Sequence, residues 1–392
     1  MEACLYQIFD PERELKELGC DSIGIALMAP KARFYSLKIC RVDLRSAMII
    51  KQEALSQGAE ASLPHEAMDL QLKQFDLLLT GTQRQLENLC SKLKLQHGEL
   101  ARLGEDILDN LHRARQRYQV LQLGHYRLPL GKRTIIMAIL NLTPDSFSDG
   151  GQYNQIEAAI IRARQMVDEG ADIIDLGGES TRPGFEPVST EEEIRRVLPV
   201  IEALKKDPAI NVPLSIDTYK AQTARAALEA GVEMVNDVWG LKADPKLAGV
   251  VAQYGAAICL MHNRKSNDYR DLVPDIIAEL RESLALARQA GIGDGRIIVD
   301  PGIGFGKDVQ QNLEVMRRLR DLRCLGYPLL LGTSRKSMIG KTLNLPVDDR
   351  LEGTAATVAY GISAGAEIVR VHDVKEMKRV AQMTDAMIRR DN

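Results

Sequence analysis

Residues 134–151 read TIIMAILNLTPDSFSDGG, an apolar run that ends in a polar, glycine-rich loop. The run Thr134–Leu140 is rich in β-branched and aliphatic residues, which favours a buried strand. Helical periodicity follows over Ile156–Val167, and Gly170 then provides a helix-ending signal. A buried strand, a polar loop and an amphipathic helix together predict one β–α unit of a parallel sheet.

The same unit recurs seven more times toward the C-terminus. Further strands are expected at Asp172–Leu176, Pro213–Ile216, Met234–Asn236, Ala257–Met261, Ile297–Val299, Leu329–Leu331 and Ile368–Val371. Eight strands that alternate with helices over residues 131–392 match the count and size of a (β/α)8 barrel, and a doubly wound open sheet is the alternative. We therefore predict a (β/α)8 TIM barrel for residues 131–392, within an α/β chain.

A polar residue follows every expected strand. These strand ends are Asn141-Leu-Thr-Pro-Asp-Ser-Phe-Ser-Asp-Gly-Gly, Gly177-Gly-Glu-Ser-Thr-Arg-Pro-Gly, Asp217-Thr, Asn236-Asp237, His262, Asp300-Pro-Gly-Ile-Gly-Phe-Gly-Lys, Gly332-Thr-Ser-Arg-Lys-Ser and Arg370-Val-His-Asp. One such Asp is often only a helix N-cap. Eight polar ends at the rim where barrel enzymes place their active site favour a binding site there.

The polar groups are sorted by chemistry along the chain. Carboxylates and amides occupy the middle strands, at Asp217, Asn236 and Asp300, close to the apolar Met261 and Phe305. Buried acceptors and donors beside apolar side chains suit a flat heterocycle with a hydrogen-bonding edge. This part of the rim is therefore expected to bind a heterocyclic substrate.

Cations occupy the last two strands, at Lys336, Arg370 and His372. The late strands are the usual phosphate side of such barrels, so these residues, together with Asn141, suit an anion.

Three other kinds of site do not fit the sequence. The glycines at Gly302–Lys307 lack P-loop spacing, and Asp308 stands where a magnesium hydroxyl is needed. His262 and His372 have no third nitrogen or sulfur ligand at metal-site spacing. No serine has an adjacent base that would define a catalytic triad.

Composition restricts the partners and the compartment. The 51 Lys plus Arg nearly cancel the 54 Asp plus Glu, and the net charge of −3 gives no global field for nucleic acid or a membrane surface. No apolar run is long enough to span a bilayer, and the N-terminus has no signal-peptide pattern. Six scattered cysteines suit reduced thiols. We expect a cytoplasmic protein with small-molecule substrates.

Residues 1–125 differ from the rest of the chain in their pattern of strand and helix signals, and they are expected to form a small α/β domain of unknown role. The runs Ile23–Ala29 and Arg33–Arg41 are β-rich, a helix is expected from the N-cap Asp43 to near Gly58, and Phe75–Leu79 is a further apolar run.

A long amphipathic helix is expected to follow Gly81 and Thr82. Apolar residues recur at intervals of seven, at Leu86, Leu93, Leu100, Ile107 and Ala114. The helix either packs on its own domain or on the barrel, or it forms a coiled-coil arm for a dimer or partner. Two interior glycines, Gly98 and Gly104, count against the arm.

The eight strand-end motifs closely resemble those of the dihydropteroate synthases, a family of pterin-binding barrel enzymes in folate biosynthesis. The resemblance covers Gly131–Asn392, and its first, second and seventh motifs separate the synthases from other pterin-binding barrels. It implies condensation of dihydropterin-hydroxymethyl diphosphate with 4-aminobenzoate, with Mg²⁺, to give dihydropteroate and diphosphate. It also implies a homodimer and a site that sulfonamides enter as mimics of 4-aminobenzoate.

The resemblance also implies roles for individual residues. The pterin would be bound by Asp217, Asn236, Met261, Asp300, Phe305 and Lys336. The diphosphate would be bound by Asn141, Thr181, Arg370 and His372, with Asn141 also a magnesium ligand. The 4-aminobenzoate pocket would include Phe147, Thr181, Arg182, Pro183 and Ser337, from loops 145–151 and 180–187 among others. The residues closest to the chemistry would be Lys336, Asp217, Asp300 and Arg370.

The expected mechanism is a dissociative, SN1-like substitution. An arylamine is unprotonated at neutral pH and needs no strong base, whereas cations around a diphosphate promote its departure. Trp239 and Asn263 depart from the residues usual in the family and put the local shape of the pocket in doubt.

Two other functions are alternatives. A corrinoid methyltransferase that binds methyltetrahydrofolate would keep Asp217, Asn236 and Asp300 but would not need Lys336 or a diphosphate site. A non-catalytic pterin-binding protein would be expected to have lost some of these groups. For residues 1–125, packing, dimer support or regulation is favoured over a second enzymatic activity.

Overall fold

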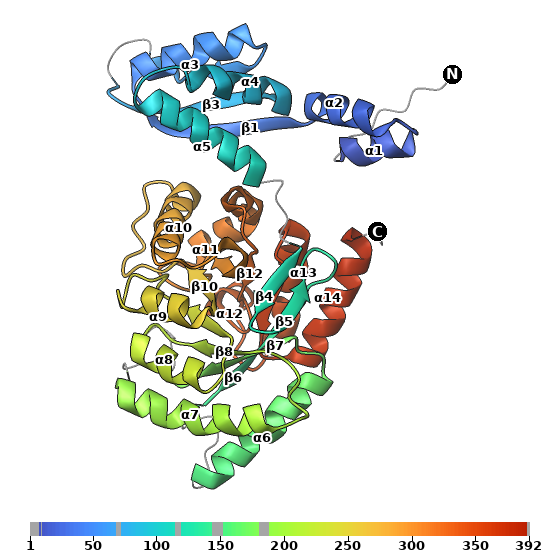
Figure 1. Cartoon of the computed structure of the whole chain (residues 1–392), viewed down its shortest axis with the longest axis vertical. Coiled ribbons are helices and arrows are strands. Elements are labelled where there is room, and N and C mark those ends of the chain that lie inside the picture. The colour runs from blue at the N-terminus through green and yellow to red at the C-terminus, as the bar shows by residue number, and fades with distance from the viewer. Residues whose placement is uncertain are drawn as a thin grey trace. The chain divides into compact units, whose positions relative to one another are not determined.

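The computed structural model describes residues 8, 10–67, 72–113, 119–142, 152–179 and 188–389. The chain divides into two compact units, Met1–Arg115 and Gln116–Asn392. Figure 1 shows the first unit in blue to teal and the second in green to red. Within the described ranges, no helix is both long and apolar enough to cross a membrane.

The second unit is built on a parallel sheet of eight strands. They are β6 (Ile135–Asn141), β7 (Ile173–Gly177), β8 (Leu214–Asp217), β9 (Met234–Asp237), β10 (Ala257–Met261), β11 (Ile297–Asp300), β12 (Leu330–Leu331) and β13 (Ile368–Val371). Neighbours run in the order β11-β10-β9-β8-β7-β6-β13-β12, and a parallel bridge between Val299 and Leu329 joins the two ends. The sheet is therefore closed, and the predicted (β/α)8 barrel and its eight strands are confirmed.

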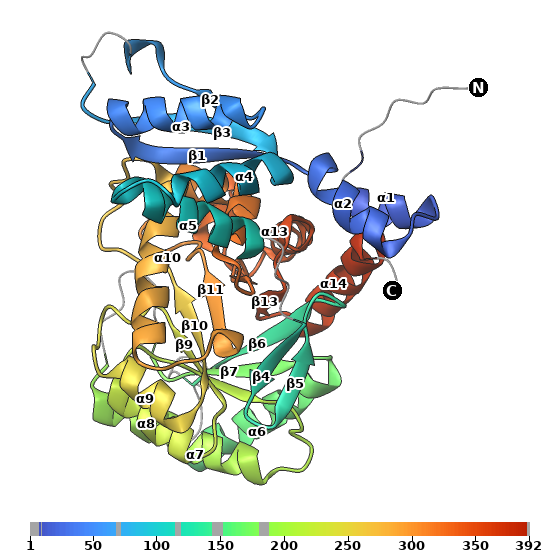
Figure 2. The same ribbon diagram turned by 45° about the horizontal axis from the view of Figure 1, so that its top comes forward.

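Helices surround the strands on the outside (Figures 1 and 2). They are α6 (Gln152–Asp168), α7 (Thr190–Lys206), α8 (Ala221–Glu229), α9 (Leu247–Tyr254), α10 (Leu272–Gln289), α11 (Val309–Arg317), α12 (Ser337–Leu343), α13 (Leu351–Ala364) and α14 (Val374–Ile388), with short 3-10 turns at Asp294–Arg296 and Leu319–Leu325. Apolar strand residues such as Ile136 and Ile174 pack outward against helix residues such as Ala163 and Val197. This layer buries the stripe that each amphipathic helix presents.

A hairpin closes the end of the barrel at which the strands begin. It consists of β4 (Val120–Leu123) and β5 (Tyr126–Pro129), paired antiparallel. Leu121 and Leu123 are fully buried in one cluster with the first residues of several strands, including Ile135, Ile173 and Met234. The hairpin therefore serves as an apolar floor, a feature that sequence analysis did not predict.

The first unit contains a three-stranded antiparallel sheet in the order β1-β3-β2, covered by helices. Its elements are α1 (Pro11–Glu17), α2 (Ser22–Ala32), β1 (Phe34–Val42), α3 (Leu44–Ser56), β2 (Glu60–Ser62), a 3-10 turn at His65–Ala67, β3 (Phe75–Thr82), α4 (Gln83–Leu93) and α5 (Glu99–Arg113). The helix expected after the N-cap Asp43 is confirmed, since the Asp43 carboxylate accepts from the Ser46 amide at 3.0 Å.

The strand expected at Ile23–Ala29 is wrong, because the segment belongs to helix α2. The Asp21 carboxylate accepts hydrogen bonds from the Ile23 and Gly24 amides, both at 2.9 Å, and so caps the helix. Ile25 and Ala29 are buried one helical turn apart, whereas the side chains between them are exposed. The N-cap and the burial of residues four apart therefore favour a helix here, although the β-branched residues favour a strand.

The single long amphipathic helix is also wrong, since two helices, α4 and α5, take its place. The chain turns at Gly98, whose φ of 67° is a left-handed conformation that favours glycine. At Gly104, a Cβ atom would lie 3.0 Å from the Cys90 carbonyl oxygen, so α5 runs close against α4. The seven-residue row, Leu86, Leu93, Leu100 and Ile107, is buried in the core of this unit. The row therefore packs on its own domain and forms no projecting arm.

Candidate active site

The C-terminal rim of the barrel brings three charged residues into one network. Arg370, in β13, donates from Nε to Asp175 Oδ2 at 2.6 Å and from Nη2 to Asp217 Oδ2 at 2.7 Å. Asp175 and Asp217 come from the neighbouring strands β7 and β8 and are almost fully buried. The Arg370 side chain remains 19% exposed, so part of it is accessible at the rim.

Several buried polar atoms at this rim have no partner among the described residues. They are Asp175 Oδ1, Ser215 Oγ and Asp217 Oδ1. Burial raises the pKa of the Asp217 carboxyl, with Arg370 opposing the shift. A buried, unsatisfied carboxylate oxygen is costly, and such groups are concentrated where a ligand completes the hydrogen bonding.

Two amides border the same space. Asn236, at the end of β9, donates from Nδ2 to Asp175 Oδ2 at 3.4 Å. Asn141 ends β6, and its Oδ1 lies 3.5 Å from where a Cβ atom on Gly177 would be. That same Cβ position is 3.9 Å from Asp217 Cβ. Asn141 and Asp217 therefore lie close together at one edge of the rim, and Asn236 is paired with Asp217 in the neighbouring strand.

The opposite edge carries Asp300, Lys336 and Phe305. Asp300 is buried at the end of β11, and its Oδ1 accepts from the Gly302 amide at 2.6 Å. The Lys336 ammonium lies 4.5 Å from the centre of the Phe305 ring and donates to the Ile303 carbonyl. A Cβ on Gly332 would be 4.0 Å from both Asp300 Oδ2 and Lys336 Nζ. The carboxylate and the ammonium thus face one space above Gly332.

Burial shifts the pKa values of this charged pair toward neutrality. It lowers the pKa of Lys336 to about 8, with Asp300 acting in the opposite direction. It also raises the pKa of Asp300, against the effect of Lys336. Perturbed pKa values at a convergent set of polar groups are typical of a functional site.

The loop after β12 is held in a strained form that positions Lys336. Arg335 has a φ of 57°, its amide donates to Thr354 Oγ1 at 3.1 Å, and its Nε donates to Asp373 Oδ2 at 3.0 Å. The Arg335 carbonyl accepts from Arg350 at 2.9 Å. A non-glycine residue in this region persists only when its surroundings fix it, and these three contacts do so.

Seven predicted site residues remain, and the structure describes three of them. His372 follows β13, and its Nδ1 lies 3.0 Å from Ser334 Oγ. Met261, 5% exposed, ends β10 beside Gly302. Ser337 is exposed at the start of α12. Four candidates from the two long loops lie outside the described residues, namely Phe147, Thr181, Arg182 and Pro183.

Asp175 was not among the site residues predicted from the sequence, although it lies at the centre of the Arg370 network. A signal was present, because a carboxylate inside a buried strand must have a partner. Asp237 is a second carboxylate at a strand end, but it binds the backbone of its own loop: its Oδ1 accepts a hydrogen bond from the Trp239 amide at 2.8 Å. It is the kind of loop-capping Asp that a strand end often carries.

No group of three or more His, Cys, Asp or Glu side chains arranged to hold a metal occurs among the described residues. A cation that keeps most of its waters and binds substrate phosphate needs only one or two protein oxygens. The Asn141 amide oxygen at the rim fits that requirement.

The barrel matches known proteins over most of its length. Residues 137–372 match the family model described as pterin binding enzyme. The dihydropteroate synthase of Clostridium beijerinckii is 55% identical over 271 residues, which cover 69% of this chain and all of the relative. The chain belongs to the dihydropteroate synthase family of pterin-binding enzymes.

Solved structures of the family agree. The dihydropteroate synthase of Clostridium difficile, crystallised in the presence of pteroic acid, superposes with a TM-score of 0.66 at 55% identity, covering 67% of this chain and all of that one. The Xanthomonas albilineans enzyme with 4-aminobenzoic acid gives 0.66 at 39% identity, covering 70% of this chain and all of that one.

One relative extends into the first unit. A probable bifunctional folylpolyglutamate synthase/dihydropteroate synthase of Haloferax volcanii is 41% identical over 367 residues, 90% of this chain and 43% of the relative. The second unit, Gln116–Asn392, is too short to contain a match of that length. The first unit is therefore shared, at least in part, with that archaeal protein.

Proposed function

We propose that this chain condenses (7,8-dihydropterin-6-yl)methyl diphosphate with 4-aminobenzoate, releasing diphosphate and 7,8-dihydropteroate for folate synthesis. The observation that carries the proposal is the set of buried, unpartnered oxygen atoms at the rim, Asp175 Oδ1 and Asp217 Oδ1, in a chain that belongs to the dihydropteroate synthases. The amino-pyrimidine edge of a pterin supplies N–H donors that these acceptors lack.

The pterin is proposed to lie between the two edges of the rim. Asp217, Asn236 and Asp300 address its amino-pyrimidine edge, while Lys336 reaches its carbonyl and a ring nitrogen. Met261 and Phe305 supply apolar contact with the ring faces. Lys336 carries a positive charge only when protonated, and its lowered pKa means that this charge is lost at mildly alkaline pH.

The diphosphate is proposed to bind near Asn141, Arg370 and His372, with Thr181 approaching from the second loop. Nε and Nη2 of Arg370 are engaged by carboxylates, whereas Nη1 donates to none of the described residues. Arg370 therefore carries positive charge to the rim in a fixed orientation, which suits an anion whose charge grows as it leaves.

Magnesium is proposed to accompany the diphosphate, with Asn141 as one protein ligand. When bound, it would neutralise the leaving group and favour cleavage of the C–O bond. The side chains of this chain would orient the pterin and place positive charge around the departing diphosphate.

The substitution is proposed to be dissociative. Cations lie around the proposed diphosphate site, and the amine nitrogen of 4-aminobenzoate is already unprotonated near neutral pH, so departure of the diphosphate is the step that needs assistance. Phe147, Thr181, Arg182, Pro183 and Ser337 are proposed to form the 4-aminobenzoate pocket. Ring-substituted arylamines test this mechanism: a shallow dependence of the chemical rate on amine basicity is expected, and a steep one contradicts it.

Three further features belong to the same proposal and rest on the family resemblance and on composition. They are a homodimer, a cytoplasmic location, and a supporting or regulatory role for the first unit. The activity itself is tested by measuring dihydropteroate formation from the two substrates with Mg²⁺. Turnover that depends on both substrates is expected, and its absence in folded protein would contradict the proposal.

A further inference from the structure

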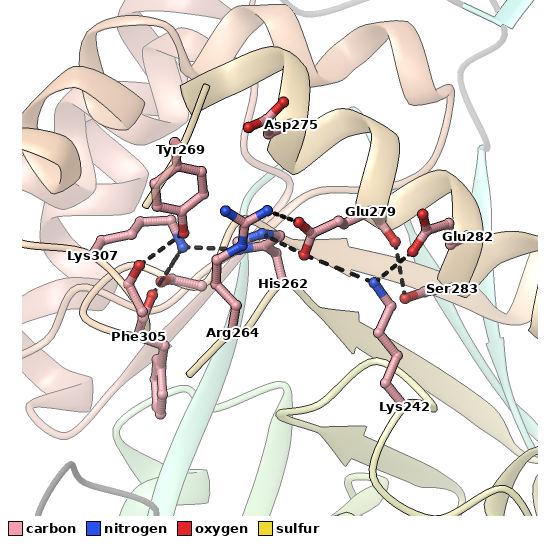
Figure 3. A network of polar contacts seen from close by, with 12 residues as sticks. Lys242, His262, Arg264, Tyr269, Asp275, Glu279, Glu282, Ser283, Phe305 and Lys307 are labelled. Carbon is pink, nitrogen blue, oxygen red and sulfur yellow. Dashed lines mark hydrogen bonds and ion pairs between the residues drawn. The ribbon is translucent and has the colours of Figure 1, made fainter. Parts of the chain in front are cut away.

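The loop that follows β11 folds around the side chain of Lys307, which lies at the end of this loop. The Lys307 ammonium donates to the carbonyl oxygens of Gly302 and Phe305, each at 3.0 Å, and lies 3.0 Å from His262 Nδ1. Figure 3 shows these three contacts converging on one nitrogen. An ammonium has three N–H donors, and here each donor has one acceptor.

Glycines allow the loop to take this form. Gly302 and Gly306 have φ values of 68° and 55°. A Cβ atom would lie 1.9 Å from the His262 carbonyl oxygen at the first position and 2.5 Å from the Arg264 carbonyl oxygen at the second. The loop therefore lies directly against the segment that follows β10, with no room for a side chain between them.

His262 is held in one tautomer between two charged groups. Its Nδ1 accepts from the Lys307 ammonium, so the proton of the neutral ring is on Nε2, which lies 3.2 Å from Glu279 Oε2. That contact lacks the alignment of a good hydrogen bond, and Nε2 has no other partner among the described residues. Burial lowers the pKa of His262 to about 4, which keeps the ring neutral.

The network continues outward from His262 to the surface. Glu279 pairs with Arg264, whose guanidinium stacks 4.2 Å from the centre of the Tyr269 ring, and Tyr269 donates to the Gly306 carbonyl at 2.8 Å. Burial works against ionisation of Glu279, but its contacts with His262 and Arg264 prevail and lower its pKa to about 2. At the far end, Lys242 lies 3.0 Å from Glu282 (Figure 3).

The two carbonyls held by Lys307 belong to residues that face the proposed pterin pocket. The Gly302 amide donates to Asp300 Oδ1 at 2.6 Å, and the Phe305 ring lies 4.5 Å from the Lys336 ammonium. Lys307 has all its N–H donors engaged by the loop and by His262, so it has none left for a substrate.

We propose that Lys307 is a positioning residue for pterin binding: supported by His262, its ammonium draws the carbonyls of Gly302 and Phe305 together and so fixes Asp300 and the Phe305 ring. This inference rests on the proposed function, because it assumes that a pterin binds between Asp300 and Asp217. Burial lowers the pKa of Lys307 to about 7, with the nearby Asp300 carboxylate opposing the shift.

The test compares Lys307→Met with the full wild-type chain. The dissociation constant of an unreactive pterin without diphosphate is measured from pterin fluorescence, and the KM values of both substrates are measured separately. Loss of the ammonium should raise the pterin dissociation constant and the pterin KM by about tenfold and leave the KM for 4-aminobenzoate within about twofold. A general loss of stability would instead lower the active fraction without this selectivity.

Lys242→Met is the matched control, since it removes an ammonium from the same network without touching the loop carbonyls. Its pterin affinity should stay within about twofold of wild type. If Lys307→Met does not fold, Lys307→Gln and His262→Gln carry the test and should weaken pterin binding in the same direction. Folded Lys307 variants that bind the pterin like wild type overturn the inference. A wild-type chain that binds no pterin would instead overturn the proposed function.

Discussion

Each end of the barrel has an arginine paired with buried aspartate, but the pairing is complete at one end and incomplete at the other. At the end where the strands begin, Arg133 donates to both oxygens of Asp172, each at 2.7 Å, and the Ile136 amide adds a bond to Asp172 Oδ2 at 2.9 Å. At the end where the strands finish, Arg370 engages one oxygen of each of two aspartates and leaves Asp175 Oδ1 and Asp217 Oδ1 without a partner among the described residues. A completed pair stabilises the fold, whereas an incomplete one is ready for a ligand.

The residues that surround these ion pairs also differ between the two ends of the barrel. The closed end is sealed by the β4–β5 hairpin, whose Leu121 and Leu123 are fully buried. The open end holds Asp217 and Lys336, whose pKa values burial has moved toward neutrality. Such groups cost folding stability and are retained where they serve binding or chemistry.

The largest effect is expected at the open end, from Lys336→Ala. Loss of the ammonium beside Asp300 should reduce turnover by about three orders of magnitude, because a group that addresses the reacting pterin is removed. The melting temperature should not fall, since a partly desolvated charge is removed at the same time. Steady-state kinetics and thermal denaturation check both, and a retained rate would remove Lys336 from the site.

Removal of the β4–β5 hairpin, the floor of the closed end, should lower the stability of the barrel. A chain that begins at Gln116 keeps the hairpin, whereas one that begins at Gly124 loses Leu121 and Leu123. The longer piece should fold and keep its activity, and the shorter one should lose about 4 kcal/mol or more of unfolding free energy, because two large apolar side chains are removed from the floor. Urea denaturation compares them. Equal stability would show that the hairpin is not a floor.

A smaller change at the same end tests the completed ion pair. Asp172→Ala leaves Arg133 without its carboxylate and should cost about 2–4 kcal/mol of unfolding free energy. The turnover of the folded fraction should stay within about twofold of wild type, since Asp172 lies at the opposite end from the substrates. A selective loss of turnover with unchanged stability would contradict the division between the two ends.

Sequence patterns predicted the barrel well because each unit repeats the same order of strand, polar loop and helix. They failed where a local signal competed with composition, as at Ile23–Ala29, where the Asp21 cap decided for helix. They also failed at Gly98, where one residue in a left-handed conformation divided an otherwise regular seven-residue row. Local periodicity does not show where a chain reverses.

The candidate site was predictable in its members and less so in its connections. Strand ends converge by topology, so Asp217, Asn236 and Asp300 could be grouped from position alone. The carboxylate that orients Arg370, Asp175, and the lysine that organises the β11 loop, Lys307, depend on contacts between segments far apart in sequence. Such pairings are set by packing and carry no periodic signal.

The smallest predicted effect concerns stability against pH. The folded-state pKa of Lys336, about 8, lies below the ordinary lysine value of 10.5, so the folded chain binds fewer protons between these values. The destabilisation is full below pH 8 and disappears as the pH rises toward 10.5. Lys336→Met should therefore raise the unfolding free energy at pH 7 by about 1–2 kcal/mol and flatten its rise with pH. Denaturant titrations across this range check the sign, and a variant less stable than wild type would contradict it.

The most direct test of the contrast between the two ends is calorimetric titration of an unreactive pterin into wild type, Asp217→Asn and Asp172→Asn. Asp217→Asn keeps the shape of the side chain but removes the charged acceptor at the open end, and Asp172→Asn makes the same change at the closed end. We predict that Asp172→Asn binds like wild type and that Asp217→Asn binds about 100-fold more weakly. Equal pterin affinity in Asp217→Asn and wild type would contradict the claim that the open end is incomplete because a pterin completes it.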